Sequence, residues 1–130
     1  MADLGRLRIL LAEDDALLAA TVDDFLTEQG FAVAVSPDGQ HALEAADRLD
    51  IAALITDLRM PRLDGVALVR ELRAVRPRLP VVVMTGYAPA DWRSSLNRDG
   101  DGPLVLLDKP IRLGQLLRAI RQVLKAATNP

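Results

Sequence analysis

The chain has 130 residues, a formal net charge of −2, 50% hydrophobic residues and no cysteine. These properties suit one globular domain, give no basic surface for nucleic acid, and exclude disulfides and thiolate metal sites. No apolar run approaches the ~20 residues of a membrane-spanning helix, and the first residues contain no signal-peptide core, so we expect a cytoplasmic protein without direct contact with nucleic acid or membrane.

Strand-like and helix-like segments alternate along the chain. An apolar run over 6–12 predicts the first strand, and an acidic turn separates it from apolar residues at helical spacing, which predict a helix up to Leu26 that Gly30 ends. Further strands are expected over 31–35, 51–56, 80–85 and 104–107. Further helices are expected around 42–46 and over 64–75, 89–96 and 111–126. The segment 97–103, rich in Asp and Gly, is expected to be an exposed loop.

Short connections join these alternating segments, which is typical of an α/β fold. We therefore expect one five-stranded parallel sheet with helices on both faces, because right-handed crossovers cover such a sheet on each side. The chain contains no internal repeat and no linker long enough to separate two domains. The prediction is a single domain over 1–130, with a core from about 6 to 126 and no effector domain.

Polar residues follow the strands where each strand ends, and in a parallel sheet these ends share one edge. The residues expected there are Glu13 and Asp14, Asp57, Thr85 and Gly86, and Asp108 and Lys109. Uncompensated carboxylates would repel one another, whereas Mg²⁺ prefers oxygen ligands and keeps places for phosphate oxygens. Lys109 adds a positive charge that a phosphoryl group could share. The pattern therefore favours phosphoryl transfer to Asp57 itself.

These motifs resemble those of the receiver domains of two-component response regulators, the family of the chemotaxis response regulator. They are Glu13-Asp14, the run DLRMPRLDG from Asp57 to Gly65, Met84-Thr85-Gly86 and Lys109-Pro110. Their order and spacing extend over the whole chain. The resemblance implies the flavodoxin-like (βα)5 receiver fold and a cis Lys109-Pro110 bond.

The resemblance also implies roles for single residues around the phosphoacceptor Asp57. Asp14 and Asp57 would ligate Mg²⁺ (or Mn²⁺) directly, Glu13 would act largely through a bound water, and the main-chain carbonyl of Arg59 would be a further ligand. A second group would bind the phosphoryl oxygens: the Thr85 hydroxyl, the Gly86 backbone N–H and the Lys109 ammonium.

By the same resemblance, the protein is a signalling switch rather than an enzyme, apart from its own phosphorylation and dephosphorylation. A histidine kinase or histidine phosphotransfer protein would donate to Asp57, and a conformational change would reach an unknown downstream protein. A homodimer through the fourth helix, fifth strand and last helix is possible in this family.

The sequence departs from the family pattern at the switch. Leu106 stands where many members have an aromatic residue that couples to the threonine, so the signal is expected to travel differently. Arg59 and Tyr87 lie two residues after Asp57 and Thr85, at positions that tune phosphoryl lifetime in this family. Because both side chains are bulky, we expect slow self-hydrolysis.

Other interpretations of the same residues remain open. The chain could be a receiver excised from a hybrid histidine kinase. A Mg²⁺-dependent aspartyl phosphohydrolase also uses a strand-end aspartate, but Arg59 occupies the place of its second acid. A nucleotide- or flavin-binding fold would need a Gly- or hydroxyl-rich first turn, whereas this turn is acidic. Asp15 and Asp64 are expected only to cap helices.

Overall fold

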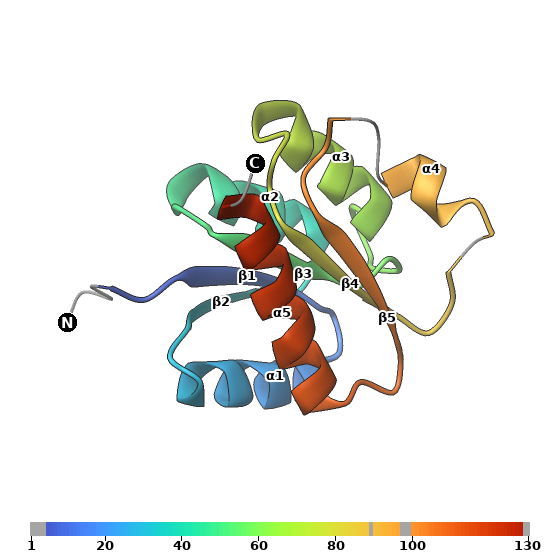
Figure 1. Ribbon diagram of the computed structural model, residues 1–130. Coiled ribbons are helices and arrows are strands. Elements are labelled where there is room, and N and C mark those ends of the chain that lie inside the picture. Colours follow the sequence, from blue (N-terminus) through green and yellow to red (C-terminus); the bar gives the residue numbers. More distant parts are fainter. Residues whose placement is uncertain (1–4, 89, 97–99, 129–130) are drawn as a thin grey trace.

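The computed structural model describes residues 5–88, 90–96 and 100–128, in which strands and helices alternate (Figure 1). The strands are β1 (Arg8–Ala12), β2 (Ala32–Ser36), β3 (Ala53–Thr56), β4 (Val81–Thr85) and β5 (Leu104–Asp108). The helices are α1 (Ala16–Glu28), α2 (Gly39–Arg48), α3 (Gly65–Val75), α4 (Trp92–Leu96) and α5 (Leu113–Thr128). Every predicted element is present with shifted ends, and the start expected for the fourth helix at Pro89 lies outside the described residues.

The strands form one parallel sheet in the order β2-β1-β3-β4-β5, which confirms the predicted fold class. The chain runs outward from β1 to β2 and then returns to the other side of β1, so the strand order reverses between β1 and β3. Open α/β sheets bind ligands at such a reversal, beyond the carboxyl ends of the strands. Because Ala12 pairs with Thr56, Glu13 and Asp57 follow at adjacent positions of this edge.

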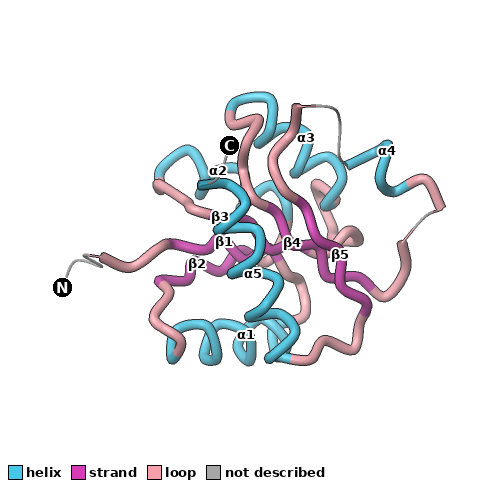
Figure 2. Tube along the Cα trace, in the orientation of Figure 1, coloured by secondary structure: helices cyan, strands magenta, loops and turns pink. Residues whose placement is uncertain are grey.

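Helices cover both faces of the sheet: α1 and α5 lie on one side, and α2, α3 and α4 on the other (Figures 1 and 2). Successive strand residues point to opposite faces, so β1 places Ile9 and Leu11 against α1 and α5, and Leu10 and Ala12 against α2 and α3. All four residues of β3 are buried, because helices cover both faces of this central strand. These two apolar layers hold the strand ends rigidly in register.

Aspartates begin the first three helices. The Asp15 carboxylate accepts hydrogen bonds from the backbone N–H groups of Leu17 and Leu18, and the Asp64 carboxylate accepts one from Ala67. Both predicted caps are confirmed; each such cap stabilises a helix by about 1 kcal/mol. Asp38 caps α2 in the same way, and its carboxylate accepts from the His41 N–H at 2.8 Å.

The segment before β5 corrects one expectation. Gly100 is exposed as expected, but Gly102 is buried and Asp101 and Pro103 are half-buried, so the expected exposure is wrong for 101–103. Its backbone is held by Arg73 of α3, whose guanidinium donates to the carbonyls of Gly102 and Pro103, both at 3.0 Å. The Asp- and Gly-rich composition of 97–103 predicted solvent exposure. The sequence gives no sign that Arg73, far away along the chain, binds the backbone of this segment.

Candidate functional site

Asp57 lies at the edge of the sheet directly after β3. Its backbone N–H donates to the Ala12 carbonyl at 3.2 Å, which ties it to the end of β1. On its other side the start of α3 packs tightly: a Cβ on Gly65 would collide with the Asp57 carbonyl oxygen and lie 2.8 Å from Leu58 Cα. The backbone that carries Asp57 is therefore fixed from both sides.

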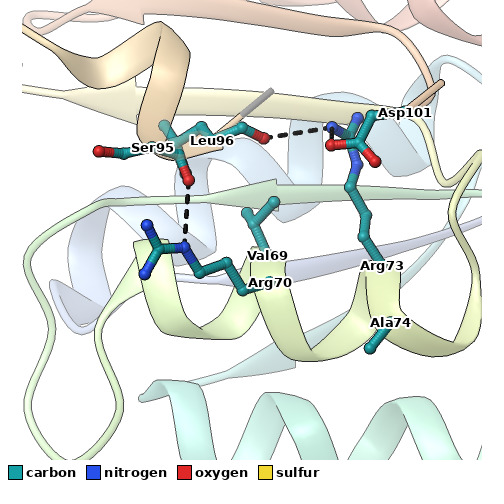
Figure 3. Close-up of a pocket in the computed structure, with 7 residues that line it drawn as sticks. All are labelled: Val69, Arg70, Arg73, Ala74, Ser95, Leu96 and Asp101. Carbon is teal, nitrogen blue, oxygen red and sulfur yellow. Dashed lines mark hydrogen bonds and ion pairs between the residues drawn. The ribbon is translucent and has the colours of Figure 1, made fainter. Parts of the chain in front are cut away.

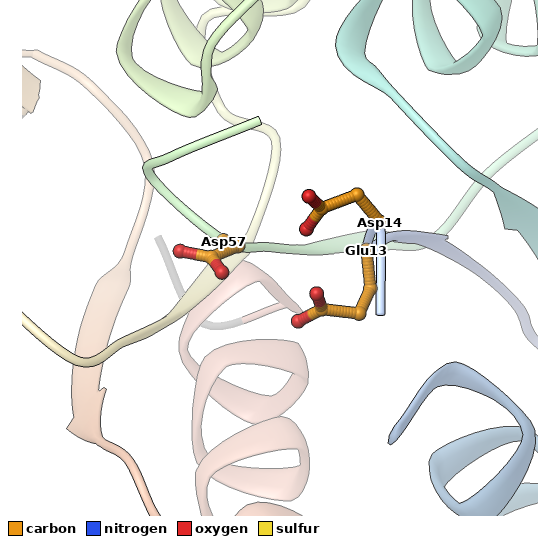
Figure 4. A group of neighbouring side chains, drawn as sticks. All are labelled: Glu13, Asp14 and Asp57. Atoms are coloured by element: carbon orange, nitrogen blue, oxygen red, sulfur yellow. The ribbon is translucent and has the colours of Figure 1, made fainter. Parts of the chain in front are cut away.

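Three carboxylates converge at this edge, as the sequence predicted. Oxygens of Glu13, Asp14 and Asp57 lie within 4.8 Å of one another, and Figure 4 shows the two β1-end side chains on the side facing Asp57. Glu13 and Asp57 are buried and Asp14 is exposed. Beside them a hollow of about 440 Å³ is lined by Asp14, the segment 58–61 and Asp64, so it borders the exposed carboxylate of the three.

Lys109 supplies the positive charge that faces this group. Its ammonium lies 2.6 Å from Asp57 Oδ2 and 3.0 Å from Glu13 Oε1. Burial raises the pKa of Glu13, and the Asp15 N–H and Lys109 offset that rise only in part. Burial would lower the pKa of Lys109, but the hydrogen bonds and charges of Asp57 and Glu13 outweigh it and the pKa is raised. The Lys109-Pro110 bond is cis, as the resemblance implied.

The loops after β3 and β4 meet beside Asp57. The Arg59 N–H donates to Asp57 Oδ1 at 3.1 Å, and the Arg59 guanidinium lies over the Tyr87 ring, 5.1 Å from its centroid. Although both residues were predicted near the site, their mutual contact was not. The sequence contained a signal for this contact, because Arg59 and Tyr87 lie two residues after Asp57 and Thr85, which follow or end two neighbouring strands.

Thr85 is buried at the end of β4, and its hydroxyl is engaged locally. It donates to the Tyr87 carbonyl at 2.8 Å and accepts from the Tyr87 N–H at 3.2 Å. Gly86 borders open space, since a Cβ there would meet no atom within 4 Å. Leu106 of β5 packs instead against the apolar cluster on the side of the sheet that α2, α3 and α4 cover. Thus Glu13, Asp14, Asp57 and Lys109 are gathered together, while Thr85 is engaged with its own loop.

This donor set fits a divalent cation. The three carboxylates offer only oxygen ligands, and two of them are buried. Among the described residues, the Lys109 ammonium forms ion pairs with these two. Hard cations such as Mg²⁺ take such ligands and usually bind one or two carboxylates together with phosphate oxygens.

A family model described as the response regulator receiver domain matches residues 9–121. The chain belongs to this family. The receiver protein CpdR of Brucella abortus is 34% identical over 122 residues, which cover 92% of this chain and 98% of CpdR. The response regulator MprA of Mycolicibacterium vanbaalenii is 35% identical over 93% of this chain and 52% of MprA, and a receiver protein of Anaeromyxobacter sp. is 34% identical over 85% of this chain and 45% of that relative. The receiver domain thus spans about half the length of the latter two.

Solved structures agree with this family. The response regulator receiver protein from Sinorhizobium medicae has a TM-score of 0.86 and 32% identity, covering 95% of this chain and 98% of its own. The chemotaxis protein CheY4 from Vibrio cholerae has a TM-score of 0.82 over 92% of this chain and 99% of its own; its 21% identity shows the fold alone.

The receiver domain is therefore a regulatory domain of two-component signalling, a phosphorylation-dependent switch, and its acidic cluster is compatible with Mg²⁺. Among the residues that the structure describes, no helix combines the length and apolar character needed to cross a membrane.

Proposed function

We propose that this receiver domain accepts a phosphoryl group on Asp57 from a phosphohistidine of a histidine kinase or histidine phosphotransfer protein. One observation carries the assignment: the Asp57 carboxylate lies 2.6 Å from the Lys109 ammonium within the acidic group at the ligand-binding edge. The P–N bond of the donor breaks as a P–O bond to an Asp57 carboxylate oxygen forms. The imidazole leaves with the bonding electrons and takes a proton from water. Later attack of water on phosphorus breaks the new P–O bond, releases inorganic phosphate and restores the carboxylate.

Asp14 and Asp57 would hold the metal directly, with Glu13 acting through water and the Arg59 main-chain carbonyl as a further ligand. When bound, Mg²⁺ (or Mn²⁺) neutralises charge on the carboxylates and on the phosphoryl oxygens. Glu13 suits an indirect role because its oxygens already accept from Lys109 at 3.0 Å and from the Asp15 N–H at 3.0 Å.

Around the transferred group, Lys109 pairs with one phosphoryl oxygen while the Thr85 hydroxyl and the Gly86 N–H bind another. Lys109 already touches the acceptor, so it stabilises the developing charge without moving far. The open space at Gly86 leaves room for the phosphoryl group.

Intact mass after incubation with acetyl phosphate, with and without Mg²⁺, tests this function. The wild type should gain one phosphoryl group only with Mg²⁺; Asp57→Asn should gain none, while Asp50→Asn, at an exposed loop position, should behave as wild type. A gain that persists in Asp57→Asn would show that another residue is the acceptor. The absence of a gain in the wild type would refute the function itself.

Arg59 and Tyr87 lengthen the phosphoryl lifetime by restricting the path of the attacking water, which their 5.1 Å stacking contact supports. Arg59→Ala and Tyr87→Ala should each hydrolyse up to about tenfold faster than the wild type. A dephosphorylation time course measures this, with Arg48→Ala at the exposed end of α2 as the control. Slower hydrolysis in the two variants than in the wild type would contradict the role.

The receiver passes its signal to a downstream protein through α4, β5 and α5, and the same surface is where a homodimer would form. CpdR has nearly the length of this chain and MprA about twice that length, so stand-alone regulators and longer response regulators both occur among the relatives. A receiver domain of a hybrid kinase is the further alternative. A cytoplasmic location agrees with these partners. A phosphohydrolase would instead turn over a generic phosphate ester many times, which an assay with p-nitrophenyl phosphate would detect.

A further inference from the structure

The backbone at Arg62 has an unusual conformation in the loop that joins β3 to α3. Its φ is 72°, and among the described residues it is the one residue other than glycine with a positive φ. The Leu63 N–H donates to the Pro61 carbonyl at 2.9 Å, so Arg62 is the middle residue of a γ-turn in its rare, strained form. Such strain persists only where the surrounding structure holds it, and it is concentrated at functional sites.

The start of α2 holds this turn in place. The carboxylate of Asp38, the buried cap of α2, has its Oδ2 at 3.7 Å from the Arg62 Nη1. The backbones also touch directly after Arg62, because a Cβ on Gly39 would collide with the Leu63 carbonyl oxygen and lie 2.8 Å from Leu63 Cβ. Asp38 is itself fixed by His41, whose backbone N–H donates to Oδ1 and whose ring Nδ1 bonds Oδ2, both at 2.8 Å. The strained turn is thus attached to the rigid start of a helix.

The same turn ends the segment that borders the phosphorylation site. Residues 58–61 line the hollow of about 440 Å³ beside the exposed carboxylate of the acidic group. The main-chain carbonyl of Arg59, proposed above as a metal ligand, belongs to this segment. The segment is held at its start, where the Arg59 N–H donates to Asp57 Oδ1 at 3.1 Å. At its other end Pro61 leads into the turn, so a change at Arg62 displaces the carbonyls between the two ends.

We propose that Arg62 and Asp38 are positioning residues for the phosphorylation of Asp57, an inference that rests on the proposed function. Their charge contact offsets the strain of the turn and keeps the segment 58–61 in the position that lets the Arg59 carbonyl serve as a metal ligand. Without the contact the turn relaxes toward a negative φ, the carbonyl moves, and Mg²⁺ binds more weakly. Both side chains act through the main chain of the loop.

The sign of one substitution separates positioning from a simple effect of charge. Arg62→Met removes a positive charge from the loop beside the carboxylates. If that charge acted only through its field, its loss would leave Mg²⁺ binding unchanged or make it tighter. Loss of positioning weakens binding instead, by about threefold to fivefold for an ion pair with one exposed partner.

Titration of each ¹⁵N-labelled variant with Mg²⁺ at one fixed pH, followed by amide resonance shifts, gives the dissociation constant without any turnover. This constant should rise about threefold to fivefold in Arg62→Met and in Asp38→Asn, which keeps the helix cap. Arg62→Lys, which keeps the charge, should bind Mg²⁺ as the wild type does. The double variant should bind about as weakly as Arg62→Met alone, because both substitutions break the same contact.

Arg70→Met is the matched control. It removes another exposed arginine from the neighbouring helix α3, but this arginine donates to the Ser95 carbonyl of α4 at 3.2 Å and not to the loop after β3 (Figure 3). Its Mg²⁺ dissociation constant should equal that of the wild type.

The rate of mass gain with acetyl phosphate supplies a second readout. In Arg62→Met the Mg²⁺ concentration for the half-maximal rate should rise by the same factor as the dissociation constant. The rate at saturating Mg²⁺ should stay within about twofold of the wild type, because the acceptor and Lys109 are unchanged.

Unchanged or tighter Mg²⁺ binding in Arg62→Met overturns the positioning role. So does a double variant that binds Mg²⁺ as the wild type does, since two independent charges would then account for the single variants. Either result leaves the proposed function intact as long as the wild type gains a phosphoryl group with Mg²⁺. If the wild type gains none, the proposed function fails, and this role fails with it.

Discussion

Lys109 faces two buried carboxylates, and its charge controls the chemistry around Asp57. A buried carboxylate without a partner tends to take up a proton, and burial alone raises the pKa of Glu13. The ammonium bonds both Glu13 and Asp57, so their charges can be kept side by side. Lys109 is thus the positive group that the two buried carboxylates share.

Lys109→Met should slow phosphorylation by acetyl phosphate about 100-fold. The substitution removes the positive group that stabilises the negative charge developing on the phosphoryl oxygens in the transition state. The rate of mass gain at fixed Mg²⁺ measures this. Lys125→Met, an exposed change on α5, is the matched control. An unchanged rate in Lys109→Met would show that the metal alone neutralises the phosphoryl group.

Asp38, which lies outside the acidic group around Asp57, should make the stability of the fold depend on pH. The hydrogen bond from the His41 N–H at 2.8 Å, together with the His41 ring and Arg62, holds the pKa of this carboxyl below its ordinary 3.8. A pKa that is lower in the folded state adds stability above pH 3.8, and this stability is lost as pH falls through the folded value. Asp38→Asn keeps the cap but removes the charge.

Urea denaturation should therefore find Asp38→Asn less stable than the wild type above pH 3.8, with the difference narrowing below it. Asp47→Asn, an exposed position of the same helix, is the control. A difference that does not change on acidification would assign the effect to packing rather than to charge.

The start of α3 is the element that positions the site most strictly. Gly65 follows the Asp64 cap and brings the helix backbone against the carbonyl of Asp57, an approach that any side chain would block. The apolar stripe of α3 then packs on the sheet and fixes that approach. The packing of the helix thereby fixes the backbone of Asp57.

Gly65→Ala should lower the free energy of unfolding by about 2 kcal/mol, because the new methyl group would force the Asp57 backbone to move. The same displacement should slow the phosphorylation of Asp57. Gly114→Ala in α5 is the opposite case: nothing lies within 4 Å of its Cβ, and alanine should stabilise the helix by up to about 1 kcal/mol. Equal effects from the two substitutions would contradict the close approach at Gly65.

In the molecule as a whole, one buried side chain joins segments that are distant in sequence. Arg73, 6% exposed, donates to the carbonyls of Leu79, Leu96, Gly102 and Pro103 and lies 3.5 Å from Asp101 Oδ2. It connects α3 to the starts of β4 and β5 and to the end of α4. The end of the sheet opposite Asp57 is held by polar contacts in addition to apolar packing.

Arg73→Met should reduce the free energy of unfolding by about 3 kcal/mol or more, because several buried carbonyls lose their donors at once. Arg70→Met, in the same helix, removes a single exposed bond to Ser95 and should cost less than about 1 kcal/mol. Urea denaturation of both variants measures the contrast. Comparable losses would show that the carbonyls of Gly102 and Pro103 find water in place of Arg73.

Local pattern was sufficient to predict the sheet, its helices and the residues that end its strands, because alternation and helical spacing are properties of neighbouring residues. The common direction of the strands then brought Glu13, Asp57 and Lys109 to one edge. Only the tertiary structure decided where polar side chains point. The spacing of Val69 and Arg73 places both on one face of α3, yet the partners of Arg73 include Gly102, 29 residues further on. Thr85 was predicted correctly as a strand-end hydroxyl, but its bonds to Tyr87 depend on how the following loop folds. Such contacts form between segments brought together by packing, and no period in the sequence encodes them.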